Sequence, residues 1–227
     1  GGPVLSAVRP EDHPWQYGVF SAHPSVKGID FWHEKGWIRS RGLSRVIESA
    51  DRVEIVSRAE WLTQRRGGKR VLAERQTITV QAPESRDRYA VDIEWELTPD
   101  EDLKIDAYEY GGLAFRPARH RDRRHLALAR APISPWQDLS GLFGDGDPAA
   151  AAGVAIFNHP MNPGFPHAWR VDGEGLINPA ITAQRPLGLS KGQPALFRYR
   201  LLVHLGHGDA KTLQDEFRSW ARVRPRE

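Results

Sequence analysis

Hydrophobic and polar residues alternate with a period of two through much of the chain. The pattern is clearest at 91–97, where four apolar residues alternate with acidic ones: Val91, Ile93, Trp95 and Leu97. Similar alternation marks 53–61, 77–80 and 103–108, and short polar turns separate these segments. This arrangement predicts a meander of antiparallel strands with one wet face. We expect two such sheets to pack face to face, burying the 91–97 set.

Two stretches lack this alternation. Residues 1–36 are rich in Pro, Gly, His and Trp, and they predict loops and short strands. Residues 117–152 are first Arg-rich and then Gly/Asp/Ala-rich, and they predict a long excursion from the sheet. Strand-like sequence resumes at GVAIFNH and at ALFRYRLLVHLG.

The C-terminal segment has helical spacing instead. Asp209 is a suitable N-cap, and Leu213, Phe217 and Trp220 fall on one helical face. We therefore expect one helix over roughly 209–221, docked on a sheet. No internal repeat or composition shift divides the chain. The prediction is a mainly β protein, an antiparallel β-sandwich with one C-terminal α-helix, with residues 1–227 as a single domain.

Composition narrows the classes of function. The 32 Lys and Arg residues nearly balance 29 Asp and Glu residues, and the cationic run RPARHRDRRHLALAR contains no aromatic residue. We interpret this run as a solvated loop and expect no nucleic-acid partner. The absence of cysteine excludes disulfides, thiol catalysis and Cys-ligated zinc. No apolar run approaches the roughly 20 residues of a membrane helix, so we expect no membrane partner.

The chain begins without Met, and a removed signal peptide would leave such a start. A cytoplasmic location is our expectation, with the periplasm or secretion left open. The sequence leaves the oligomeric state open as well.

Four stretches concentrate side chains able to do chemistry. They are EDHPWQYG with Asp12, His13 and Gln16; HPSVKGIDFWHE with His23, Asp30, Trp32 and His33; YEYGGLAFR with Glu109 and Arg116; and FNHPMNPGFPHAW with Asn158, His159, Asn162, His167 and Trp169. Each lies at a predicted strand boundary, where a sheet scaffold can bring distant residues together.

Every one of these features also has a purely structural interpretation. A His-Pro dipeptide can simply set a turn, its imidazole satisfying a backbone group. Glu109 can face solvent, the Gly111–Gly112 pair can be a bulge, and Trp15, Trp32 and Trp169 can be core residues. The argument for function rests on the recurrence of such turns at strand ends.

Taken in order, RPEDHPWQYGVF, VKGIDFW, EYGGLAFR and GVAIFNHPMNPGFPHAW resemble the landmarks of the bacterial PmoA-like family, also called methane oxygenase PmoA. The likeness runs from about Arg9 to the C-terminal helix. It implies a galactose-mutarotase-like supersandwich and a carbohydrate ligand. It does not imply methane oxidation, since that activity belongs to a membrane copper enzyme. Family members commonly have DHPHH where this chain has Trp15 and Gln16, which weakens any role of that turn shared with the family.

The leading hypothesis is acid/base chemistry on a sugar or oxidised (keto) sugar, such as mutarotation, elimination or hydrolysis. Glu109 is the candidate base, and His13 and His159 are candidate acids or orienters of ligand hydroxyls. Arg116 is a candidate for holding a carboxylate or an oxyanion. The remaining candidates for ligand binding are Asp12, Gln16, His23, Asp30, Trp32, Asn158, Asn162 and Trp169. We expect no cofactor.

Two alternatives remain open. A non-catalytic carbohydrate-binding or accessory module would use the same aromatic and amide groups without matched titrating pairs. A His-rich metal site built from His13, His23 and His159 is the weaker alternative, because no HxH or HExxH spacing is present, and we expect no metal.

Overall fold

The computed structural model describes residues 4–83, 85, 87–127, 133–143 and 151–222, and only the backbone of 120–127. Within these residues the chain forms fourteen strands followed by one helix. They are β1 (Val19–Ala22), β2 (Trp37–Glu48), β3 (Arg52–Leu62), β4 (Arg70–Gln81), β5 (Arg88–Pro99), β6 (Leu103–Ile105), β7 (Gly112–Phe115), β8 (His120–Ala127), β9 (Trp136–Phe143), β10 (Ala151–Asn158), β11 (Ala168–Val171), β12 (Ile177–Ala180), β13 (Leu187–Leu189), β14 (Ala195–Leu205) and α1 (Ala210–Ala221).

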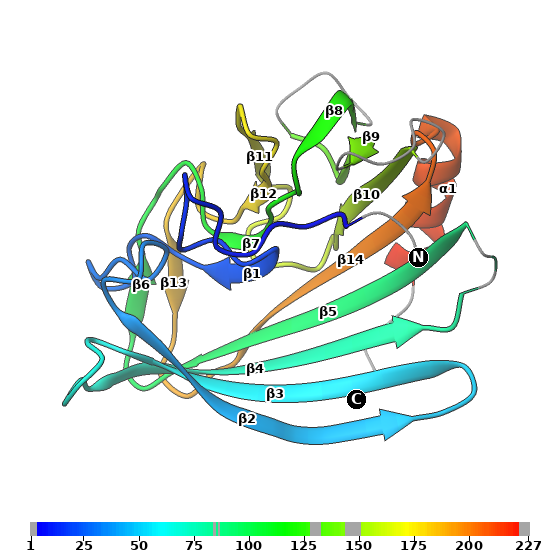
Figure 1. The fold of residues 1–227 in the computed structure, drawn as a ribbon. Helices are drawn as coiled ribbons and strands as arrows, with labels where there is room; N and C mark the ends of the chain where they lie inside the picture. The colour runs from blue at the N-terminus through cyan, green and yellow to red at the C-terminus, as the bar shows by residue number, and fades with distance from the viewer. Residues whose placement is uncertain (1–3, 84, 86, 128–132, 144–150, 223–227) are drawn as a thin grey trace.

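The strands form one large antiparallel sheet and two smaller ones (Figure 1). The large sheet has the order β2-β3-β4-β5-β14-β10-β9-β8, the small sheet β1-β7-β12-β11, and β13 pairs with β6. The pairing of β5 with β14 joins distant parts of the sequence, from Ala195 opposite Leu97 to His204 opposite Arg88. The predicted mainly antiparallel β fold is confirmed.

The main core lies between the large and small sheets. Trp95 and Phe197 of the large sheet and Leu113, Phe115 and Ile177 of the small sheet belong to one buried cluster. All four residues of the predicted 91–97 set belong to this core, Val91 being partly buried. Their burial follows from the period of two, which places alternate side chains on one face.

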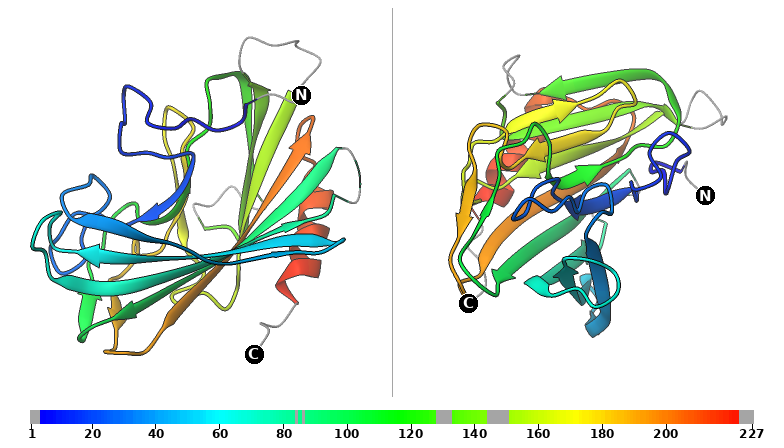
Figure 2. Two further views of the ribbon diagram at one scale, coloured as in Figure 1. Left: turned by 60° about the horizontal axis from the view of Figure 1, so that its bottom comes forward. Right: turned by 90° about the vertical axis from the view of Figure 1, so that its left-hand side faces the viewer.

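Helix α1 covers the other face of the large sheet, as Figure 2 shows. Asp209 caps it, its Oδ1 accepting a hydrogen bond from the Thr212 backbone N–H at 2.8 Å. Leu213, Phe217 and Trp220 are buried against residues of β9, β10 and β14. The predicted helix and its buried face are confirmed.

The predicted excursion at 117–152 is wrong in part. Strand β8 lies inside it and pairs antiparallel with β9, which in turn pairs with β10. Strand β9 lacks a clear alternation because both of its faces are covered: Leu139 belongs to the main core and Trp136 to the helix cluster. Strand β8 is the edge strand of the large sheet, and its sequence HRDRRHLA has no alternation of apolar and polar residues. Residues 128–132 and 144–150 of the predicted excursion lie outside the described residues.

Candidate functional site

Arg116 and the N-terminal loop are hydrogen-bonded together at the end of strand β7. The backbone N–H of Arg116 donates to the Gly18 oxygen at 2.6 Å, and the Arg116 oxygen accepts from Ala7 at 3.1 Å. These bonds fix the N-terminal loop against the small sheet. Two tight turns within the loop, His13 N–H to Pro10 O and Gln16 N–H to His13 O, then present residues 12–16 beside the arginine.

The side chains of Arg116, Asp12 and His13 are therefore joined by hydrogen bonds. The Arg116 guanidinium, 8% exposed, donates to Asp12 Oδ2 at 2.6 Å and to Gln16 Oε1 at 3.2 Å. The same Asp12 oxygen lies 2.9 Å from Nδ1 of His13. The hydrogen bond from His13, assisted by Arg116, lowers the pKa of Asp12 to about 2 although partial burial opposes this. Asp12 is therefore a carboxylate at neutral pH, and Arg116 is engaged in holding it.

His33 and Asp30 form a second imidazole–carboxylate pair. His33 Nδ1 lies 2.7 Å from Asp30 Oδ2, and the His33 backbone N–H donates to Asp30 Oδ1 at 2.9 Å. The loop is held behind this pair because the Asp30 backbone oxygen accepts from Lys35 and Gly36 at 2.8 and 2.9 Å. A carboxylate only accepts, so Nδ1 of each of these two histidines carries the hydrogen and Nε2 is left unprotonated in the neutral ring.

Trp15 brings the two pairs together. Its ring centroid lies 5.5 Å from that of His13 and 4.8 Å from that of His33, in edge-to-face geometry on both sides. Both imidazoles are partly exposed, 32% for His13 and 28% for His33. In the described part of the chain, neither Nε2 atom has a hydrogen-bond partner. We call His13, Asp12, His33, Asp30 and Trp15 the dyad site.

Aromatic contacts continue from the dyad site to Glu109. His33 meets the Tyr110 ring at 6.1 Å, and Arg170 of β11 lies 5.1 Å over that ring. The Glu109 carboxylate bonds to Arg170 at 3.1 Å and is 71% exposed. Glu109 is thus connected to the dyad site through Arg170 and Tyr110 and lies at its rim. Glu109 lies in the loop between β6 and β7, so it does not end a strand.

His23 lies beneath this surface and has a different environment. It is fully buried, its Nδ1 accepts from the Ser25 backbone N–H at 3.1 Å, and its Nε2 donates to Thr182 Oγ1 at 2.6 Å. Burial lowers its pKa to about 4, so it is neutral. A Cβ at Gly111 would lie 2.2 Å from His23 Cδ2, which explains the first glycine of the Gly111–Gly112 pair. His23 is placed as a structural residue.

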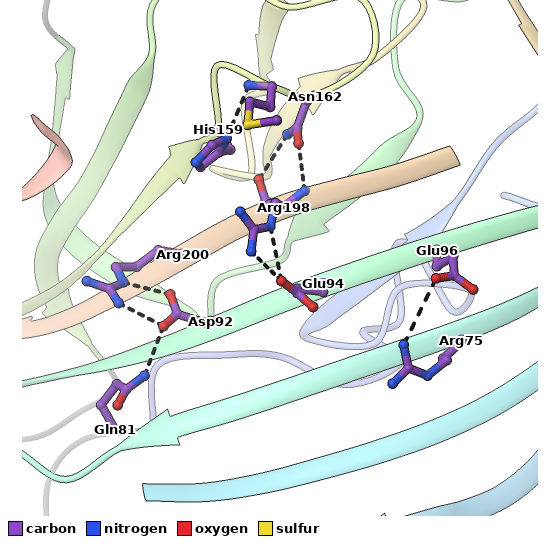
Figure 3. Close-up of polar contacts among 10 residues, drawn as sticks. Arg75, Gln81, Asp92, Glu94, Glu96, His159, Asn162, Arg198 and Arg200 are labelled. Atoms are coloured by element: carbon purple, nitrogen blue, oxygen red, sulfur yellow. Dashed lines mark hydrogen bonds and ion pairs between the residues drawn. The ribbon is translucent and has the colours of Figure 1, made fainter. Parts of the chain in front are cut away.

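The fourth predicted stretch forms a separate, enclosed network, shown in part in Figure 3. Asn162 holds β14 by accepting from the Arg198 backbone N–H at 2.6 Å and donating to the Arg198 oxygen at 2.9 Å. It also donates to Asn158 Oδ1 at 2.8 Å, and Asn158 donates through Nδ2 to Nδ1 of His167 at 3.1 Å. These amides are committed to the fold and to one another.

His159 belongs to this enclosed network. It is buried, its Nδ1 accepts from the Met161 backbone N–H at 3.1 Å, and its ring meets Trp220 of α1 at 4.9 Å. Burial, aided by nearby Arg198, lowers its pKa. Among the described residues, no hydrogen bond or ring contact joins His159 to His13 or to Glu109. The contacts thus bring His13 and Glu109 to one surface and place His159 at the interface of a loop with the helix.

A model of one protein family matches residues 1–218 of the chain. The chain belongs to the family of unknown function DUF6807. The resemblance to the PmoA-like family is not confirmed by this match. No curated protein matches the chain.

Solved structures that resemble this DUF6807 chain include the crystal structure of an α-galactosidase from Lactobacillus brevis. The TM-score is 0.37 at 10% sequence identity, over 97% of this chain and 35% of that one. The chain thus spans about a third of the length of that enzyme.

The remaining predicted residues of this DUF6807 chain are buried. Gln16 supports Arg116, Trp32 packs on Phe20 at 4.9 Å and on Tyr110 at 5.0 Å, and Trp169 donates through Nε1 to the Ser134 oxygen at 2.6 Å. The structural interpretation of the two tryptophans fits these positions. Within the described residues, no cluster of three His, Asp or Glu side chains has the geometry to hold a metal ion, and no helix is long and apolar enough to cross a membrane.

Sequence reasoning named His33 among the side chains able to do chemistry but assigned it no role. It interpreted Trp15 as a core residue and did not single out Tyr110. A usable signal was present for His33, because Asp30 and His33 are spaced three apart in a Gly-containing loop, where a carboxylate can bond both the backbone and the ring. Trp15 and Tyr110 contact the histidines only through tertiary packing, and no local pattern predicts that.

Proposed function

We propose that this chain is an enzyme that uses His13 and His33 as an acid/base pair on a sugar-like ligand. The observation that carries the proposal is the dyad site itself. Two partly exposed imidazoles are each oriented by a carboxylate through Nδ1, both contact Trp15, and both keep Nε2 free of protein partners within the described residues. A carboxylate on Nδ1 fixes the orientation and the tautomer of the ring, as in other acid/base histidines.

The chemistry of such a pair suits sugars. In mutarotation, one group removes the proton of the anomeric hydroxyl while the other protonates the ring oxygen. The ring C–O bond then breaks to give the open-chain aldehyde, which closes again on its other face with the protons returned. Elimination or hydrolysis on a sugar or keto sugar requires the same division between a base and an acid.

The surroundings of the dyad site support a hydroxylated ligand with apolar faces. Trp15 and Tyr110 offer ring surface, while Glu109 and Arg170 offer acceptors and donors at the rim. We assign Glu109 a role in binding ligand hydroxyls. Arg116 is a positioning residue, since its guanidinium holds Asp12 and through it His13.

A non-catalytic sugar-binding module is the second candidate, and the exposed pair of Glu109 and Arg170 over Tyr110 favours it. Such a surface binds a sugar without needing either imidazole to titrate. The two candidates differ in one respect: a module binds without turnover, and its affinity does not depend on the state of His33.

Exchange between the α and β anomers of D-glucose, D-galactose and D-galacturonate, followed by polarimetry, tests the proposal. We expect faster exchange than in buffer for at least one sugar. We also expect a loss of about 10²–10⁴-fold in His13→Gln and in His33→Gln, typical for a general acid or base. His207→Gln is the control, because His207 is exposed and, among the described residues, its only side-chain hydrogen bond is to Ser140 Oγ at 3.3 Å.

Equal rates in His33→Gln and the native chain would contradict the proposal. Calorimetric binding of a sugar without any acceleration of exchange would favour the binding module instead.

A further inference from the structure

A cavity of about 270 Å³ opens between the large and small sheets. Its walls come from strands of both: Ile78 of β4, Val91 and Ile93 of β5, Val203 of β14, and Leu113 and Phe115 of β7. Val19 and Tyr89 also line the cavity, and they are 40% and 43% exposed, so the cavity has an open side. Figure 1 shows β1 and β7 above β5 and β14 in this region.

Close packing does not account for this space. Protein interiors have few voids larger than a water molecule, and water in a large apolar cavity finds few hydrogen-bond partners. A cavity of about 150 Å³ with similar aliphatic and aromatic walls is known to take up benzene. The space between β5, β14 and β7 is larger, so its size and its walls suit an apolar molecule of about two fused six-membered rings.

The cavity is lined at one place by a polar pair of fixed orientation. Gln76 Nε2 donates to Ser21 Oγ and to Glu74 Oε1, both at 2.9 Å. Glu74 is itself buried and held by Trp61 Nε1 at 2.7 Å. In this orientation both hydrogens of Gln76 Nε2 are engaged, and the Ser21 and Glu74 oxygens are the acceptors.

This orientation defines what the pair still offers. The Ser21 hydroxyl accepts from Gln76, so its own hydrogen is free to donate. Gln76 Oε1 has no hydrogen-bond partner in the described part of the chain. One donor and one acceptor side by side match a hydroxyl group, which both accepts and donates.

We propose that this cavity is a second binding site, for a small, mainly apolar molecule that carries one hydroxyl group. The site is separate from the dyad site: none of His13, Asp12, His33, Asp30 and Trp15 lines it. Phe20 lines the cavity on one side and contacts Trp32 at 4.9 Å on the other. The ligand's rings lie among the valine and isoleucine walls, and its hydroxyl meets Ser21 and Gln76.

The test uses 2-naphthol and naphthalene, which differ by the one hydroxyl, in equilibrium dialysis against the whole chain. We expect saturable binding of 2-naphthol at one site, with about three- to tenfold lower affinity for naphthalene, as expected for one or two neutral hydrogen bonds. Ser21→Ala should lower the affinity for 2-naphthol toward that for naphthalene and leave naphthalene binding unchanged.

Filling the cavity supplies the second arm. Ile78→Trp should abolish binding of both probes, and Val91→Phe, a smaller change, should weaken both. Thr79→Trp is the matched control, since residue 79 follows on the same strand but points to the other face. Circular dichroism checks that each variant is folded.

Three results would overturn the proposal: no saturable binding of 2-naphthol, equal affinity for the two probes, or unchanged binding in folded Ile78→Trp and Val91→Phe. None of these results bears on the anomer exchange at the dyad site.

Discussion

Three His-Pro dipeptides of this chain look alike in sequence and differ in structure. At His23 and at His159, the imidazole Nδ1 accepts the backbone N–H two residues ahead, at 3.1 Å in both cases. At His13, Nδ1 instead donates to the preceding residue, Asp12. The first two rings close local turns and are buried, whereas the His13 ring is partly exposed.

The difference fixes the position of the ring hydrogen. His23 and His159 must carry it on Nε2, because Nδ1 accepts; burial accordingly lowers the pKa of both. His13 carries the ring hydrogen on Nδ1 and leaves Nε2 without a protein partner in the described part of the chain. The same holds for His33, which is not part of a His-Pro dipeptide. A His-Pro dipeptide alone therefore does not indicate chemistry. Chemistry is indicated instead by a carboxylate partner on Nδ1 together with an Nε2 atom that has no protein partner.

The largest effect is expected where a buried histidine meets the helix. Trp220→Ala removes the ring that packs on His159 at 4.9 Å and on Phe157 at 6.1 Å. We expect it to lower the free energy of unfolding by about 3–5 kcal/mol, as for other large aromatic truncations in cores. Urea denaturation measures this. An unchanged midpoint would show that the helix is not docked as described.

Acid should weaken the fold through His23. The pKa is about 4 in the folded protein against 6.5 for the free side chain, so the unfolded chain binds this proton more tightly. Stability is therefore fully present above pH 6.5 and falls as the pH drops to 4, by roughly 3 kcal/mol. Denaturation curves at pH 7 and pH 4.5 measure the loss. His23→Gln keeps a donor for Thr182 and cannot titrate, so a pH dependence as large as that of the native chain would contradict this account.

Asn162→Ala should cost less, about 1–3 kcal/mol. The substitution leaves the Arg198 backbone N–H without its partner, whereas the Arg198 oxygen still accepts from the His159 backbone N–H at 3.2 Å. A buried unsatisfied backbone group carries a cost of this size. Chemical denaturation measures it. Anomer exchange should be retained in the folded variant, and its loss would indicate that the 158–167 loop belongs to the site after all.

The smallest effect on stability is expected at the dyad site. His33→Gln alters a partly exposed side chain, so the free energy of unfolding should change by less than about 1 kcal/mol. The same variant should lose anomer exchange, which separates chemistry from folding. A large destabilisation without an effect on exchange would make His33 a structural residue like His23.

The sequence was sufficient for elements whose pattern is local. The alternation at 91–97 and the 209–221 spacing led directly to β5 and α1. Strand β9 was missed because it is covered on both faces and so has no period of two. Strand β8 was missed because its sequence HRDRRHLA lacks any alternation of apolar and polar residues.

The candidate site was predictable in the same uneven way. Asp12 and His13 are adjacent, so their pairing was within reach of sequence reasoning. Arg116 reaches Asp12 only because β7 and the N-terminal loop are bound together, and Trp15 meets His33 only through packing. Grouping His159 with these residues rested on turn-forming motifs at predicted strand boundaries, and the His-Pro turns among them have two different environments in the structure.

The position of the ring hydrogens tests the central claim most directly. In ¹⁵N–¹H spectra of the labelled chain at neutral pH, we predict the Nδ1–H form for the neutral rings of His13 and His33 and the Nε2–H form for His23 and His159. Addition of a sugar that undergoes exchange should shift the Nε2 signals of His13 and His33 together and leave His159 unchanged. The Nε2–H form at His13 and His33, or a shift at His159 without one at His33, would contradict the account.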